Sequence, residues 1–81
     1  MDQLVTLITG TRKGLGHRFA EHYLDLGHIV VGCSRGEASI TAPGYHHHVV
    51  DVSVEADVRR LFASIRSKFG RLDHLLNNAG I

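Results

Sequence analysis

The hydrophobic positions along this chain change repeatedly between the spacing of strands and the spacing of helices. Residues 3–9 form a short run rich in β-branched residues that stops at Gly10, as a buried strand does. The apolar positions then recur at helical spacing, and Gly27 lies where a left-handed cap would end a helix. The pattern predicts a strand and then a helix whose apolar positions are Leu15, Phe19, Tyr23 and Leu26.

The rest of the chain repeats this alternation. Apolar runs at residues 29–33, 45–51 and 72–77 predict three further strands. Before the last of them we expect a second helix, with Ser53 as its N-cap and Gly70 as its C-terminal cap. Its first turn and apolar stripe consist of the acids Glu55 and Asp57 and of Val54, Val58, Leu61, Phe62, Ile65 and Phe69.

Alternating strands and helices predict an α/β fold with a parallel sheet and helices on its faces. The expected order is β-α-β-loop-β-α-β. Residues 34–44 connect the second and third strands and contain the only proline. This connection is barely long enough for a parallel crossover, which usually contains a helix, so we expect a loop there.

The composition is that of a globular chain and excludes several classes of partner. Hydrophobic residues make up 43% and charged residues 21%, as in ordinary soluble domains. The formal charge of +1 is too balanced for a nucleic-acid or membrane surface. No apolar run approaches the ~20 residues of a membrane span, and the N-terminus lacks the pattern of a signal peptide. We therefore expect a cytoplasmic protein.

The cysteine and histidine residues do not predict a metal site. A single cysteine, Cys33, excludes an internal disulfide and a multi-thiolate zinc site, and we expect it to be a small strand residue. The run 46–48 contains three histidines, but adjacent strand residues point to alternate faces of a sheet. One strand cannot direct all three side chains at one ion, so no metal is expected.

The turn between the first strand and the first helix carries the clearest chemistry. Gly10, Gly14 and Gly16 are spaced Gly-x-x-x-Gly-x-Gly. Such a turn lets the backbone approach a pyrophosphate, and the following helix directs free N–H groups and its positive dipole end at that charge. We expect a side chain at Gly14 or Gly16 to occupy space that the pyrophosphate needs; the alternative is a tight turn without a ligand. The other candidates in this turn are Arg12, Lys13 and Leu15.

With these residues in view, the whole chain resembles the N-terminal part of the short-chain dehydrogenase/reductase family. Four stretches carry the resemblance, in the family's order and spacing: Thr9-Gly10-x-x-x-Gly14-x-Gly16, Asp51-Val52, Gly70-Arg71-Leu72-Asp73 and Asn77-Asn78-Ala79-Gly80. The resemblance implies the N-terminal half of a Rossmann-type doubly wound sheet with strand order 3-2-1-4. It makes residues 1–81 a partial dinucleotide-binding domain, incomplete at its C-terminal end.

The same resemblance assigns roles at the carboxyl ends of the strands, where open parallel sheets bind ligands. It implies a hydrogen bond from Asp51 to the adenine amino group, with Val52 as its neighbour. It also implies that Asn78 and the backbone of Ala79 and Gly80 face the ribose. The alternatives are that Asp51 caps a helix and that residues 77–78 form a simple turn.

Residues after the second strand predict NADP rather than NAD. NAD-binding members of such folds place a carboxylate there, whereas this chain has Ser34 and Arg35. A hydroxyl and a guanidinium suit a 2′-phosphate, and Lys13 would add a second positive charge. Glu37 is the competing acid, but it lies further along the loop. The alternative for Arg35 is a solvated loop charge.

The chain lacks the catalytic pair that the resemblance implies, a Tyr-x-x-x-Lys pattern with a serine. Tyr23 and Tyr45 are followed four residues later by Gly27 and Val49. We therefore expect the cofactor-binding segment of an NADP-dependent oxidoreductase that exchanges hydride with a carbonyl or alcohol. The alternative is a complete, non-catalytic nucleotide-binding or interaction module.

The last strand carries the expectation about partners. In the order 3-2-1-4 it lies at the edge of the sheet, although Leu72, Leu75 and Leu76 have the pattern of buried residues. An apolar unpaired edge recruits another strand or aggregates. We expect a companion chain or C-terminal segment that continues the sheet, inactivity of the isolated chain, and a homo-oligomer when the protein is complete.

Overall fold

Six elements alternate along the chain in the predicted order, and the computed structural model describes residues 3–78. The connection between the second and third strands contains no helix, so the prediction of a loop is confirmed. The elements are β1 (Val5–Thr9), α1 (Gly14–Asp25), β2 (Ile29–Ser34), β3 (Tyr45–Val49), α2 (Glu55–Phe69) and β4 (His74–Leu76).

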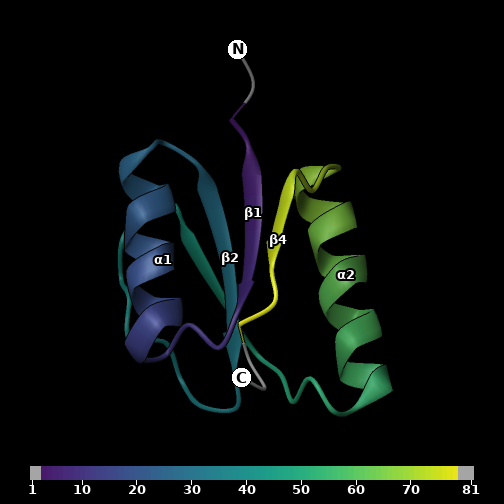
Figure 1. Ribbon diagram of the computed structural model, residues 1–81. Helices are drawn as coiled ribbons and strands as arrows, with labels where there is room; N and C mark the ends of the chain where they lie inside the picture. Colours follow the sequence, from purple (N-terminus) through teal and green to yellow (C-terminus); the bar gives the residue numbers. More distant parts are fainter. Residues whose placement is uncertain (1–2, 79–81) are drawn as a thin grey trace.

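The four strands form one parallel sheet in the order β3-β2-β1-β4, which confirms the predicted topology. Thr6 of β1 pairs with Val30 on one side and with His74 on the other. Figure 1 shows α1 and α2 on opposite faces of this sheet. The carboxyl ends of the strands and the N-termini of both helices lie together at the bottom of that view. We call this side the carboxyl edge.

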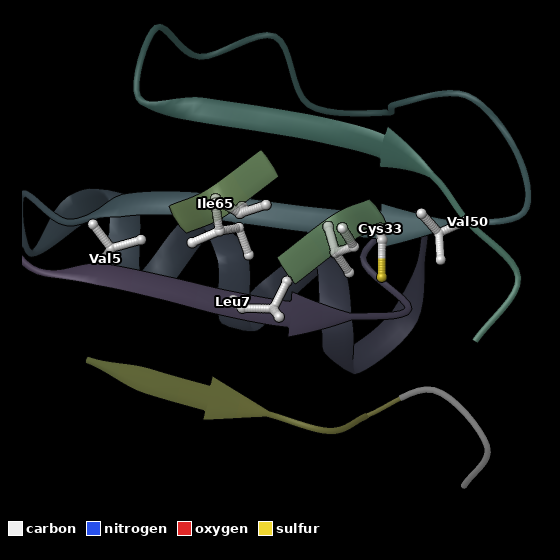
Figure 2. Close-up of a cluster of buried hydrophobic side chains, with 7 residues drawn as sticks. Val5, Leu7, Cys33, Val50 and Ile65 are labelled. Carbon is white, nitrogen blue, oxygen red and sulfur yellow. The ribbon is translucent and has the colours of Figure 1, made fainter. Parts of the chain in front are cut away.

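The larger hydrophobic cluster lies between the sheet and α2 (Figure 2). Because strand side chains alternate between faces, Val5 and Leu7 of β1 point to the same side as Cys33 of β2. Leu61 and Ile65 of α2, four residues apart, close this cluster. Each fully buried aliphatic side chain stabilises the fold by about 1.5–3 kcal/mol relative to exposure. The smaller cluster under α1 is built on Ile8, Ala20 and Val30.

The predicted apolar face of α1 is wrong at its two ends. Leu15 and Leu26 are 61% and 59% exposed, whereas the buried positions of the helix are Gly16 and Ala20. These two small residues are four apart and lie on one face, so the helix can approach the sheet closely. In α2, Phe62 and Val54 of the predicted stripe are also exposed.

The glycine caps are confirmed, and the predicted serine cap is not. Gly27 and Gly70 have φ of 85° and 70° and follow the last turns of α1 and α2. The N-cap of α2 is Val54, without a side-chain hydrogen bond. Ser53 instead donates its hydroxyl hydrogen to Asp51 Oδ1. The helix begins one residue later than predicted, so Ser53 lies just before the N-cap.

The predicted burial of the fourth strand is wrong in part. Leu75 is 53% exposed, while Leu72 and Leu76 are half-buried against the two clusters. Leu75 pairs with Leu7 of β1, but the α2 side chains of the larger cluster close over β1 and β2. Within residues 3–78, neither helix is long and apolar enough to cross a membrane.

Candidate functional site

A cavity of about 700 Å³ opens at the carboxyl edge, between the glycine turn and the ends of β2 and β3. It brings together eight of the residues that the sequence nominated: Gly10, Arg12, Lys13, Ser34, Arg35, Asp51, Val52 and Asn78. Cys33, Gly36, Val50 and Ser53 also line it. Gly14, Leu15 and Gly16 are not among its lining residues, and Ala79 and Gly80 lie outside the described residues.

The glycine turn leaves the start of α1 open toward an anion. Gly10 has a φ of 73°, and its N–H and that of Thr11 donate to the carbonyl of Cys33 at 2.8 and 3.3 Å. The helix then begins after Lys13, which is extended and makes no side-chain cap hydrogen bond. The first N–H groups of a helix need partners from outside it, and an anion can supply them.

Two glycines of this turn are required for different physical reasons. Gly14 has a φ of 64°, and a Cβ there would meet nothing within 4 Å. A Cβ on Gly16 would collide with the Gly10 carbonyl and press on the Asn78 amide. A side chain at Gly16 would therefore collide with the protein itself; that it would also occupy space needed by a pyrophosphate stays a prediction.

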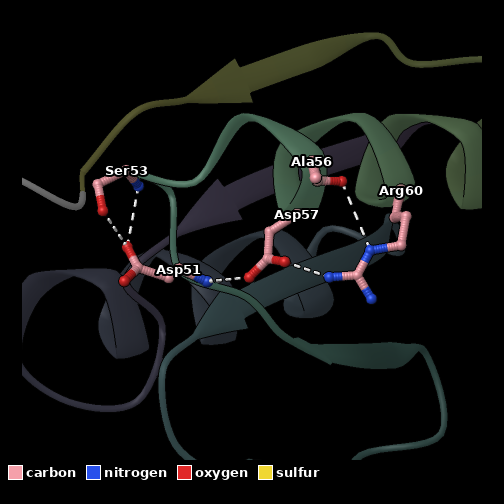
Figure 3. Close-up of polar contacts among 5 residues, drawn as sticks. All are labelled: Asp51, Ser53, Ala56, Asp57 and Arg60. Atoms are coloured by element: carbon pink, nitrogen blue, oxygen red, sulfur yellow. Dashed lines mark hydrogen bonds and ion pairs between the residues drawn. The ribbon is translucent and has the colours of Figure 1, made fainter.

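Asp51 lies in the connection after β3 and is ionised at neutral pH (Figure 3). Its Oδ1 accepts the Ser53 hydroxyl at 2.6 Å and the Ser53 N–H at 2.9 Å. These bonds, and more weakly the charge of Arg35, hold the pKa of Asp51 below its ordinary value. Within residues 3–78, Oδ2 accepts no hydrogen bond. One oxygen is thus held while the other is available to a ligand.

The neighbouring acid fixes the backbone of Asp51. Asp57, in the first turn of α2, accepts the Asp51 N–H at 3.1 Å and also pairs with Arg60 (Figure 3). Since α2 is capped at Val54, Asp51 is not the helix cap that was its alternative role. Its carboxylate is oriented by the turn that leads into the helix.

Asn77 and Asn78 tie the end of β4 to the first strand. Asn78 donates from Nδ2 to the Gly10 carbonyl at 3.2 Å, and Thr9 donates to Asn77 Oδ1 at 3.2 Å. The Asn78 amide thus contacts the glycine turn directly. These contacts are more specific than those of a simple surface turn.

Three basic residues line the cavity. Arg35 is exposed and lies close enough to Asp51 to lower its pKa. The guanidinium of Arg12 lies against Gly36, where a Cβ would collide with it, and Lys13 completes the lining. Glu37 is exposed and is not among the lining residues within the described part of the chain.

Cys33 and the three histidines belong to the frame of the sheet. Burial raises the pKa of the Cys33 thiol, so it stays protonated at neutral pH and is a poor nucleophile. His46 packs edge-on against Phe69, whereas His47 bonds Tyr45 on the other face. Within residues 3–78, no group of three or more His, Cys, Asp or Glu could hold a metal ion.

Sequence reasoning missed Gly36 and Ser53. Gly36 follows Arg35 and belongs to no motif, and its role depends on the Arg12 guanidinium that covers it. Ser53 was expected as a helix cap, but it holds Asp51 instead. The proximity of Ser53 to an acid two residues earlier was the available indication, because Asp side chains readily bond the backbone two residues ahead.

Comparison with known proteins gives a consistent result. A family model for short chain dehydrogenases matches residues 4–81. An L-fucose dehydrogenase of Bos taurus is 37% identical over 81 residues, covering 94% of this chain and 30% of the bovine protein. The chain spans only 25–36% of the lengths of the bovine protein and of three further curated relatives that are 33–40% identical to it.

Solved structures share the arrangement of the six elements. The structure of ElxO with NADP bound has a TM-score of 0.89 and 34% identity, covering 99% of this chain and 36% of that one. A 3-ketoacyl-(acyl-carrier-protein) reductase from Brucella melitensis complexed with NADH has a TM-score of 0.82 and 32% identity, covering 89% of this chain and 32% of that one.

Proposed function

Since this chain belongs to the short chain dehydrogenase family, we propose that its carboxyl-edge cavity binds the adenosine and pyrophosphate part of NADP(H). The observation that carries this proposal is convergence: Lys13 at the N-cap of α1, the ionised Asp51 and the Ser34-Arg35 pair line one cavity. A dinucleotide needs an anion site and polar groups for its ribose and adenine at such an edge.

Each part of the cavity has a proposed role. The N–H groups at the start of α1 would bind the pyrophosphate, with Lys13 beside them. Asp51 would accept the adenine amino group through Oδ2, with Val52 beside it. Asn78, already fixed on the Gly10 carbonyl, would face the ribose together with the backbone of Ala79 and Gly80.

NADP is the proposed choice of cofactor because the cavity is basic where a 2′-phosphate would lie. Arg35 and Ser34 would contact this phosphate, and Arg12 and Lys13 add positive charge. Solved relatives of comparable identity contain either NADP or NADH, so the choice depends on this chain's own residues.

For the complete protein we propose transfer of a hydride between NADP(H) and a carbonyl or alcohol substrate. The nicotinamide carries the hydride, and this chain's residues hold the adenosine end. The proton donor would come from outside these 81 residues, since neither Tyr23 nor Tyr45 has a lysine four residues later. A companion segment or subunit would supply it while pairing with the outer edge of β4.

Isothermal titration calorimetry with NADP⁺ and NAD⁺ tests the cofactor proposal. We expect NADP⁺ to bind about tenfold more tightly or better, because charged hydrogen bonds to the extra phosphate contribute more than about 1.4 kcal/mol. Arg35→Asp should reverse or abolish this preference. The control is Arg66→Asp, which makes the same charge change in the last turn of α2, away from the cavity, and should leave the preference in place. Equal affinities of the unmodified protein for both dinucleotides would refute it.

A further inference from the structure

Resting on the proposed function, we infer that Tyr45 and His47 of β3 are positioning residues for cofactor selectivity. They orient residues 34–36, which we call the phosphate loop, toward the adenosine 2′-phosphate. Neither residue lines the cavity within the described part of the chain, so they act through the loop rather than on the ligand.

A chain of hydrogen bonds connects the glycine turn to the phosphate loop. Thr11 Oγ1 lies 2.5 Å from Tyr45 Oη, which lies 2.6 Å from His47 Nδ1. His47 Nε2 lies 2.9 Å from the Gly36 carbonyl and 3.1 Å from Ser34 Oγ. Ser34 also donates its hydroxyl to the Gly36 carbonyl at 2.8 Å. The two residues that flank Arg35 are therefore both held by His47.

The chemistry of these groups determines which one donates and which one accepts in each hydrogen bond. A carbonyl only accepts, so His47 Nε2 carries the proton that bonds Gly36, and Nδ1 is then the acceptor for the Tyr45 hydroxyl. Burial raises the pKa of Tyr45, so its hydroxyl keeps the proton that it donates. Tyr45 in turn accepts from Thr11. Every donor in the chain then has an acceptor.

The hydrogen bonds between Thr11, Tyr45 and His47 need a glycine in the strand beneath them. A Cβ on Gly32 of β2 would collide with both Tyr45 Oη and the Thr11 hydroxyl oxygen. Gly32 thus allows two side chains from different elements to meet above β2. Thr11 is fully buried at that point, so the contact is a fixed support rather than a surface contact.

Support from both sides should orient Arg35. Ser39 donates to the Arg12 carbonyl at 2.6 Å, and the Arg12 guanidinium lies against Gly36. His47 holds the same loop from the β3 side. A loop held in its bound conformation loses less entropy on binding, and here that gain applies to the ligand that Arg35 contacts.

His46, the neighbour of His47 in β3, is a matched control for the His47 substitutions. His46 is adjacent to His47 but points to the other face, where it packs on Phe69. Substituting His46 tests whether any disturbance of β3 changes binding, and substituting His47 tests the hydrogen-bond chain.

The experiment compares two probes that differ by the 2′-phosphate alone, adenosine 2′,5′-bisphosphate and 5′-AMP, by calorimetry on the 81-residue chain. The readout is the ratio of their dissociation constants. A variant that is partly unfolded weakens both probes equally, so a purely structural role would not move this ratio. His47→Phe and Tyr45→Phe should each lower the preference for the bisphosphate about fivefold, the scale of one net hydrogen bond.

His47→Gln can still donate to the Gly36 carbonyl and should recover most of the preference, and His46→Phe should leave the ratio unchanged. A His47→Phe variant with the unmodified ratio, or an equal loss in His46→Phe, would overturn the inference. A ratio near one in the unmodified chain would instead overturn the NADP selectivity beneath it, and the inference would fall too. Loss of all binding in the unmodified chain would contradict the proposed function itself.

Discussion

At the scale of single residues, two glycines of the same motif, Gly14 and Gly16, are needed for different physical reasons. Gly14 needs its left-handed backbone and faces open space, whereas Gly16 needs the absence of a side chain against the Gly10 carbonyl. The spacing identified both residues, because a strand-turn-helix unit with three glycines is a recognisable pattern. It could not separate their roles, since the position of the Gly10 carbonyl over the helix depends on tertiary structure.

Substitutions at these two glycines should therefore differ in severity. We expect Gly16→Ala to lower the free energy of unfolding by about 2 kcal/mol, the scale of an overpacked site. Gly14→Asn should cost less than about 1 kcal/mol, because Asn adopts left-handed φ more readily than other non-glycine residues. Urea unfolding followed by circular dichroism measures both. A Gly16→Ala variant as stable as the unmodified chain would show that the turn can move away.

At the scale of elements, the alternation of periods predicted the order of strands and helices and the loop before β3. The details that failed depend on where the helix begins and on packing. Ser53 does not cap α2 because the N-cap is the next residue, Val54. Leu75 is exposed because α2 packs over the neighbouring strands. The series of hydrogen bonds that links Thr11 to His47 passes over β2 at Gly32. No local sequence pattern predicts it, because its members lie far apart in the sequence.

Asp73 connects two elements and should make the fold sensitive to acid. Its Oδ2 accepts the Val5 N–H at 2.8 Å, and Arg71 donates to both of its oxygens. Arg71 and then the Val5 N–H hold the pKa of Asp73 below its ordinary value. The stability it contributes is present above an ordinary carboxyl pKa, about 4, and is lost as the pH falls through the lower folded value.

Urea midpoints at pH 7 and pH 3 check this contribution, with Asp73→Asn as the test variant and Asp25→Asn, an exposed acid of α1, as control. The Asp73 variant should be less stable at pH 7 and should lose less stability on acidification than the unmodified chain. If the Asp73→Asn variant and the unmodified chain lost the same stability between pH 7 and pH 3, the acid sensitivity would come from another carboxylate, such as Asp51.

At the scale of the whole molecule, the carboxyl edge explains why the candidate site was largely predictable. Parallel strands end at one side of the sheet, so motifs that follow β1, β2, β3 and β4 must converge there. Eight predicted residues line one cavity for this reason. The residues that support them were not predictable, since support comes from contacts such as that of Arg12 with Gly36.

The outer edge of β4 should make the isolated chain associate with itself. Leu75 is 53% exposed on a strand whose outer side is unpaired among the described residues, and such edges recruit further strands. Size-exclusion chromatography with light scattering should show concentration-dependent association. Leu75→Lys should reduce it, whereas Leu26→Lys, at a similarly exposed position directly after α1, should not. A monomer at every concentration would contradict this expectation.

The central claim is that the carboxyl-edge cavity is the dinucleotide site. The most direct test is to follow the backbone amide resonances of the ¹⁵N-labelled chain during titration with NADP⁺. We expect saturable shifts concentrated at Lys13 to Gly16, at the phosphate loop and at Asp51 and Val52, with the amino ends of the strands unaffected. Saturable shifts centred elsewhere, or none at a concentration where the bisphosphate probe binds, would contradict it.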